Sequence, residues 1–179
     1  MKLFFGLIMI VISGIISDLS AQEKFPDSWA GNYKGDLLVY SVDSVRMKIG
    51  MELKIAETRN DSVFKWTIIY DFKEKKDVRA YELLIVDRSK GLYKIDEKNS
   101  IVIESYLRNS NILTSFFKVM NSFIIATYTK KKDTIEFEII SSASDPVSTT
   151  GKIKEGEEEI PEVNTFPVNG RQKAVLFKY

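Results

Sequence analysis

The chain has 179 residues, no cysteine, no histidine and a formal net charge of +1. This length suits one domain with a substantial core. The lack of histidine excludes serine–histidine and cysteine–histidine catalysis, imidazole zinc sites and haem held by a proximal histidine. A nearly neutral charge also lacks the basic footprint of a nucleic-acid-binding protein. We therefore expect a protein that is not an enzyme, with no cofactor, no metal and no nucleic-acid partner.

The first 21 residues have the pattern of an export signal. Lys2 supplies the positive start, residues 3–16 are almost wholly apolar, and the polar stretch that follows ends in Ala21. Cleavage after Ala21 fits this pattern; an uncleaved anchor is the alternative, although a membrane-spanning helix needs about 20 apolar residues. We expect an exported protein, periplasmic or extracellular and from a Gram-negative bacterium, which touches a membrane only if the signal stays uncleaved. Residues 22–179 then form a single domain.

From residue 36 onward, apolar and polar residues alternate, which is typical of strands that are buried on one side. The clearest run is 45–56, and polar turns separate it from later runs. After a first strand that begins near Trp29, the expected strands are 45–56, 63–72, 78–86, 92–95, 101–107, 112–119, 123–129, 134–140 and 173–179. Between Asp87 and Asp133 a turn arrives about every 9–12 residues, as in an all-β meander.

Tight turns between strands predict the topology. They make neighbouring strands antiparallel, and they favour an up-and-down barrel over a Greek-key sandwich, which needs long crossovers. We expect an all-β antiparallel up-and-down barrel of about 8–10 strands, with the last strand paired to the first around residues 33–42. Residues 141–171 contain a glutamate cluster without the spacing of a calcium loop, and we expect one long solvated loop there.

The stretch Trp29-Ala30-Gly31-Asn32-Tyr33-Lys34-Gly35, between an export signal and a meander, resembles the calycin group. This group contains lipocalins, fatty-acid-binding proteins and lipocalin-like bacterial proteins. Lipocalins place a glycine two residues before the tryptophan, whereas this chain has Asp27 there and a glycine two residues after. The resemblance implies structural roles for Trp29, Gly31 and Tyr33, with Trp29 plugging the closed end of the barrel. It also implies that an arginine from late in the chain covers Trp29, and Arg171 is the candidate.

Candidate ligand-binding residues lie on the strand faces that we expect to point inward. They are Met47, Met51, Trp66, Tyr70, Arg79 and Tyr81. If Arg79 and Tyr81 point inward, a guanidinium and a phenol stand side by side, which suits a carboxylate or phosphate group. The pair resembles the arginine–x–tyrosine pair that fatty-acid-binding proteins use for a head group. The alternatives are that Arg79 lies outside near Asp77 or Asp71, and that the apolar residues simply fill the barrel.

These patterns predict an exported, monomeric, lipocalin-like barrel that binds a small apolar or amphipathic molecule in its lumen. The alternative is a filled barrel that serves as an envelope structural or protein-interaction module, with residues 146–161 in its working surface. An open lumen of roughly 300 Å³ or more would favour the first function.

Overall fold

The structure is a computed structural model that describes residues 24–73, 75–156 and 158–179, so the predicted signal peptide, residues 1–21, lies outside the described residues. One short 3₁₀ helix, η1 (Asp27–Trp29), precedes the strands. The strands of the main sheet are β1 (Gly31–Tyr40), β2 (Val45–Glu57), β3 (Val63–Phe72), β4 (Lys75–Asp87), β5 (Leu92–Asp96), β6 (Val102–Arg108), β7 (Ile112–Val119), β8 (Ser122–Lys131), β9 (Thr134–Ala143) and β14 (Val168–Lys178).

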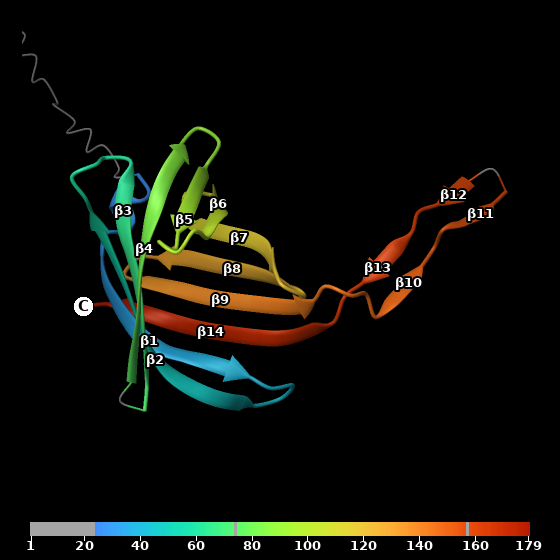
Figure 1. Cartoon of the computed structure of the whole chain (residues 1–179), viewed down its shortest axis with the longest axis horizontal. Helices are drawn as coiled ribbons and strands as arrows, with labels where there is room; N and C mark the ends of the chain where they lie inside the picture. Colours follow the sequence, from blue (N-terminus) through green and yellow to red (C-terminus); the bar gives the residue numbers. More distant parts are fainter. Residues whose placement is uncertain (1–23, 74, 157) are drawn as a thin grey trace, which may run out of the picture.

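These ten strands form a closed antiparallel barrel in the order β1-β14-β9-β8-β7-β6-β5-β4-β3-β2 (Figure 1). Nine of them follow one another as hairpins, and β14 closes the ring by pairing with both β1 and β9. The predicted up-and-down barrel and the pairing of its last strand with its first are confirmed, and the fold is compatible with a calycin-like barrel. Some boundaries differ: β4 begins at Lys75 and so includes part of the connection expected at 73–77, β9 extends to Ala143, and β14 begins at Val168 instead of residue 173.

The segment between β9 and β14 is a β-arm and not the long loop expected at 141–171. Its four short strands are β10 (Ser148–Thr150), β11 (Ile153–Glu155), β12 (Glu158–Ile160) and β13 (Val163–Thr165). They form two ladders, β10 with β13 and β11 with β12, and the arm projects away from the barrel (Figure 1). Proline and charge suggested a loop, but Pro161 lies between the two ladders and leaves both intact.

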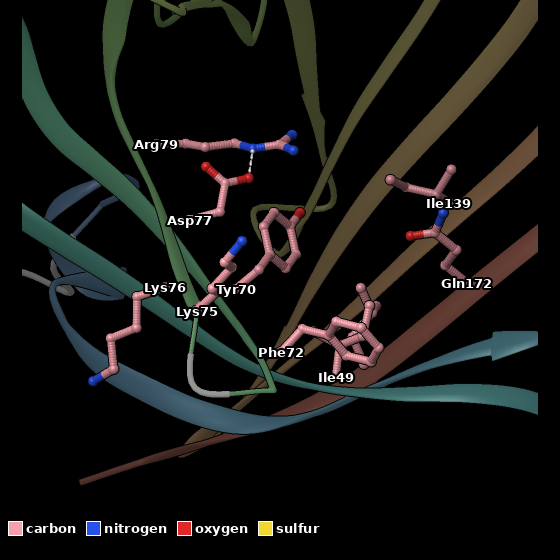
Figure 2. Close-up of a pocket in the computed structure, with 10 residues that line it drawn as sticks. Ile49, Tyr70, Phe72, Lys75, Lys76, Asp77, Arg79, Ile139 and Gln172 are labelled. Atoms are coloured by element: carbon pink, nitrogen blue, oxygen red, sulfur yellow. Dashed lines mark hydrogen bonds and ion pairs between the residues drawn. The ribbon is translucent and has the colours of Figure 1, made fainter.

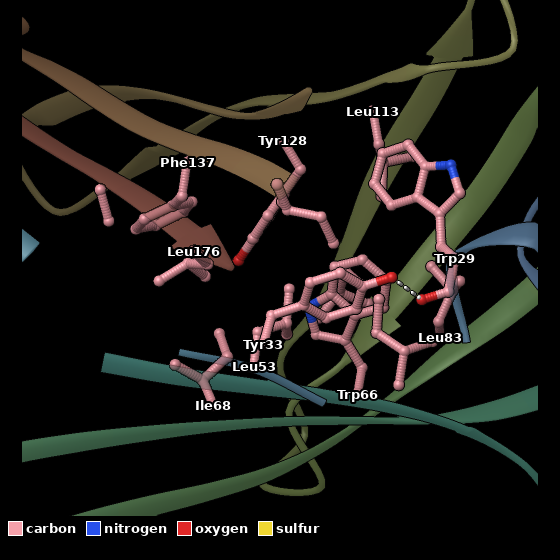
Figure 3. Packing of buried hydrophobic residues seen from close by; sticks show 14 of the residues in the cluster. Trp29, Tyr33, Leu53, Trp66, Ile68, Leu83, Leu113, Tyr128, Phe137 and Leu176 are labelled. Atoms are coloured by element: carbon pink, nitrogen blue, oxygen red, sulfur yellow. Dashed lines mark hydrogen bonds between the residues drawn. The ribbon is translucent and has the colours of Figure 1, made fainter. Parts of the chain in front are cut away.

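Half of the barrel interior is filled by packed side chains. Aromatic rings form a continuous series across it, with neighbouring ring centroids 4.7–6.4 Å apart, from Phe25 through Trp29, Trp66 and Tyr128 to Phe137. Aliphatic residues from other strands fill the spaces around the rings, among them Leu53, Leu83, Leu113 and Leu176 (Figure 3). Because each strand contributes every second residue to this interior, alternation in the sequence becomes one contiguous core.

Trp29 is buried at this end of the barrel, and the arginine that binds the neighbouring backbone is Arg88 and not Arg171. Arg88, in the turn after β4, donates a hydrogen bond from Nη1 to the carbonyl oxygen of Phe25 at 2.6 Å and lies 3.6 Å from the carboxylate of Asp27. Arg171 is paired with Tyr40 across β14 and β1, where it is on the outer face and bound to Glu138. It follows Gly170 at the other end of the barrel, so it cannot reach Trp29.

Gly31 and Tyr33 hold the plug against the first strand. Gly31 has a φ of +145°, which strongly favours glycine, and it turns the chain from η1 into β1. The fully buried Tyr33 donates a hydrogen bond from its hydroxyl to the carbonyl oxygen of Trp29 at 2.9 Å (Figure 3). Both residues therefore have the structural roles that the resemblance implied.

Replacing Trp29 with alanine should lower the free energy of unfolding by about 3–5 kcal/mol, because it leaves a cavity at the closed end. Urea unfolding followed by the fluorescence of Trp66 measures this change. The exposed Phe177 on the outer face of β14 provides a control, and Phe177→Ala should cost less than about 1 kcal/mol. Equal losses for the two variants would contradict the plug.

Tyr33 should make stability depend on alkaline pH. Burial, with a smaller effect from the negative charge of Asp133, raises the pKa of Tyr33 to about 12. A tyrosine in the unfolded chain ionises near pH 10, so this contribution is complete below about pH 10 and is lost as the pH rises to about 12. Tyr33→Phe should reduce the decline of the unfolding free energy over that interval by about 2 kcal/mol. Urea unfolding at several pH values tests this, and Tyr40→Phe on the outer face is the control.

Candidate ligand-binding cavity

The half of the barrel opposite the plug contains a cavity of about 720 Å³ that opens at the mouth. Its residues come from strands that are neighbours in the ring: β1 to β4, β9 and β14. They are Leu37, Ile49, Tyr70, Phe72, Lys75, Lys76, Asp77, Arg79, Ile139 and Gln172 (Figure 2). The cavity exists because the large aromatic residues of the core lie in the other half of the lumen.

One wall of the cavity is apolar, and the facing wall is cationic. Leu37 and Ile49 are directly paired across β1 and β2, and Ile139 lies on β9. The charged wall is the first part of β4, where Lys75, Asp77 and Arg79 alternate on the inward face with a formal charge of +1, while Lys76 lies at the rim near Asp71. A ligand in this cavity therefore meets hydrocarbon on one side and positive charge on the other.

Arg79 is held over Tyr70 on the cationic wall. Its Nε donates a hydrogen bond to Asp77 Oδ2 at 3.0 Å, and its guanidinium carbon is 4.9 Å from the centre of the Tyr70 ring (Figure 2). Direct pairing of Tyr70 with Asp77 and of Ile68 with Arg79 puts these side chains on one face of the β3–β4 hairpin. The hydrogen bond occupies Nε, and the terminal amino groups of the guanidinium extend beyond Asp77 toward the lumen.

The electrostatics keep this wall positive and its phenols neutral. Burial alone lowers the pKa of Arg79, but the hydrogen bond that Arg79 donates to Asp77 and the neighbouring tyrosines outweigh burial and raise it. Burial raises the pKa of Tyr70 and of Tyr81 above the usual tyrosine value. At neutral pH both phenols keep their protons and can donate hydrogen bonds to an anion.

The predicted ligand residues divide into two groups. Arg79 and Tyr70 line the cavity, Tyr81 packs against the core beside them, and Met47 lies at the mouth, paired with Val39 and 39% exposed. Met51 and Trp66 are fully buried in the core, and their expected place in a ligand cavity is thereby corrected. Trp66 belongs to the aromatic series, and Met51, directly paired with Tyr70, is covered by the packed core.

The structure combines features of the two alternatives for Arg79, a lumen-facing position and a position near Asp77. The residue faces the lumen, yet it also forms the ion pair with Asp77 that the other alternative required. Sequence reasoning missed Lys75 and Asp77, since it placed 73–77 in a solvated turn. Extending the alternation of Tyr81 and Arg79 by two more steps would have put Asp77 and Lys75 on the same inward face. Gln172 and Ile139 could have been found from their position on the inward faces of the closing strands.

The barrel wall beside the cavity is incompletely paired. β4 pairs with β5 only from Glu82 onward, so 75–81 run past the end of β5. β6 pairs with β7 at 106–108, and next to this ladder Ser105 Oγ and Ser115 Oγ form a buried hydrogen bond of 2.6 Å. The described residues show no further β6–β7 pairing toward the mouth. The serine pair therefore holds the wall together where backbone pairing ends.

Other kinds of site find no support in the described part of the chain. Residues 24–73, 75–156 and 158–179 contain no group of three acidic side chains placed to hold a metal ion. No helix in those ranges is long and apolar enough for a membrane span. Comparison of the chain with protein-family models, with curated proteins and with solved structures finds no match in any of the three. The cavity must therefore be interpreted from its own residues.

Replacing either serine of the buried pair should destabilise the barrel. Ser105→Ala or Ser115→Ala leaves the other hydroxyl buried without its partner, at a cost of about 1–3 kcal/mol each. The double variant should cost less than the sum of the two single changes, because no hydroxyl is then left unpaired. A double-mutant cycle by urea unfolding measures this coupling, and the longer, partly buried pair Thr114–Thr127 at 3.3 Å is the control cycle. Strictly additive costs at Ser105 and Ser115 would contradict the coupling.

Proposed function

We propose that this protein is a non-enzymatic binding protein for a small amphipathic molecule that has an anionic head group and an apolar body. The observation that carries the proposal is the cavity of about 720 Å³, in which an apolar wall faces a cationic one. Cavities that bind small molecules have volumes of about 300–1,000 Å³, are mostly apolar, and contain a few polar groups that orient the ligand. The mouth of this barrel has a cavity of such a volume, with apolar residues from β1, β2 and β9 and charged groups from β4 that could orient a ligand.

The head group is bound by Arg79, with Lys75 beside it on the same inward face of β4. A carboxylate that accepts hydrogen bonds from a guanidinium gains about 1.5–3 kcal/mol per charged hydrogen bond. The phenol of Tyr70, kept protonated by burial, supplies a further donor close to the guanidinium. The apolar body of the ligand packs against Leu37, Ile49 and Ile139.

Asp77 makes this site selective. It already accepts a hydrogen bond from Arg79, so an incoming anion must share the guanidinium with a fixed carboxylate. A neutral ligand gains nothing from displacing this contact, whereas a singly charged anion balances the net charge of +1 of Arg79, Lys75 and Asp77 and a doubly charged one would leave the site negative. A single-chain monoanion such as a fatty acid fits this balance of charge and volume best.

The setting that we propose is the exported one. The pattern of residues 1–21 and the resemblance of residues 29–35 to calycins support a role outside the cytoplasm, as a periplasmic or extracellular carrier. The alternative role, an interaction module, has support from the exposed β-arm. The two roles use different surfaces of the molecule.

Titration with a fluorescent anthroyloxy fatty acid tests the proposal. The wild-type protein should bind the probe saturably, and Arg79→Ala should weaken binding by roughly tenfold or more, which is the loss of one charged hydrogen bond. Asp77→Asn should strengthen binding, because it removes the competing carboxylate while keeping the side-chain shape. The methyl ester of the probe should bind with the same affinity to wild type and to Arg79→Ala.

Lys48→Ala is the matched control, since Lys48 is an exposed cation paired with Asp36 on the outer face of the neighbouring strand β2. It should bind the probe as the wild type does. Absence of saturable binding by the wild-type protein, or equal affinity of Arg79→Ala and wild type for the acid, would overturn the proposal.

A further inference from the structure

The β-arm, residues 144–167, stands clear of the barrel (Figure 1). Within the described residues its four strands pair only with one another. It nevertheless carries exposed apolar side chains, including Val147, Ile153 and Val163. An isolated two-stranded ribbon is marginally stable in water, so an arm of this length and composition would gain stability from contact with another surface.

A second unusual feature lies beside the base of the arm. Five apolar side chains are adjacent on the outer face of β7, β8 and β9 and at the end of the arm, and we call them the outer aromatic patch: Phe116, Phe123, Ile125, Ile140 and Phe166. Phe123 is 5.9 Å from Phe116 and 5.5 Å from Phe166, between ring centroids. Phe116 is 65% exposed. Contiguous apolar surface of this kind marks interaction sites on soluble proteins.

The arm and the barrel have formal charges of opposite sign. The sequence of the arm contains six carboxylates and two lysines, a formal charge of −4. The remaining residues from 24 onward contain 23 lysines and arginines and 17 carboxylates, a formal charge of +6. The arm points away from its own barrel, so this attraction acts most strongly between the arm of one molecule and the barrel of another.

We infer that the arm and the outer aromatic patch form a docking surface for a second copy of this chain. The chain carries both halves of the contact: an acidic arm with apolar side chains, and a basic barrel with an apolar patch at the arm's base. In a two-fold symmetric pair the same surface is used twice. An arm that starts beside the patch of its own barrel then lies across the patch of the second copy, and two patches and two arms are covered together.

This inference concerns the outside of the barrel and does not depend on ligand binding in the lumen. It differs from the monomer that the sequence analysis expects. Specific interfaces of stable dimers bury about 1,200–2,000 Å² in total. Two extended arms together with two aromatic patches provide surfaces of the kind that such an interface needs.

Sedimentation velocity of the chain from residue 22, at about 1–100 µM, tests the inference. The wild type should form dimers in this range. Phe116→Glu should weaken the dimer more than tenfold, because it places a charge in the centre of the patch. Val78→Glu introduces the same charge at an exposed position on the outer face of β4, away from the patch, and should leave the dimer unchanged.

A combined variant, Glu155→Gln, Glu158→Gln, Glu159→Gln and Glu162→Gln, should also weaken the dimer without changing the patch. Tryptophan fluorescence of the buried Trp29 and Trp66 verifies that each variant is folded, and Phe116→Ser replaces Phe116→Glu if the latter fails to fold. A wild-type protein that stays monomeric up to about 100 µM would overturn the inference and point to a different partner. Dimers that resist both the patch variant and the arm variant would overturn it too.

Discussion

Pairing of β14 with β1 closes the sheet into a barrel and so creates an enclosed interior. Without that ladder the ten strands would form an open sheet with two edges and one wet apolar face; with it, every second residue of every strand points into one enclosed space. The width of that space depends on the number and tilt of the strands, so the choice of side chains decides how much of it is filled. Both the core and the cavity are consequences of this closure.

The interior is divided along its length. Near the plug, aromatic residues from η1, β3, β8 and β9 meet across the lumen and leave no space for a ligand. Toward the mouth, the inward residues become smaller or charged, backbone pairing between β6 and β7 ends, and a cavity opens. The stable half holds the strands in register, and this allows the other half to carry an arginine, a lysine and a carboxylate on its inward face without a packed core around them.

The outside of the molecule also has two parts. Most of the outer face of the barrel is polar and carries exposed ion pairs, which contribute little stability individually. The β-arm differs because its formal charge is opposite to that of the barrel, and the outer aromatic patch differs because its apolar side chains are adjacent to one another. Cavity and arm meet at the same rim, so a protein that binds a ligand in its mouth would do so close to the surface through which we infer that two copies associate.

The sequence by itself determined the fold class, the strands, the closure of the barrel and the plug of Trp29, because alternation, turns and a buried tryptophan are local signals with one physical meaning. It also put Tyr70 on the inward side, and it offered an inward Arg79 as one of two alternatives. Only the tertiary structure decided how far along the barrel each inward residue lies: Met51 and Trp66 share the period of the ligand residues yet lie in the core. It also placed Arg88 beside the plug instead of Arg171, and it showed that residues 144–167 form an arm. Period specifies which face a residue occupies, whereas its height along the barrel depends on register between strands, which arises from long-range pairing.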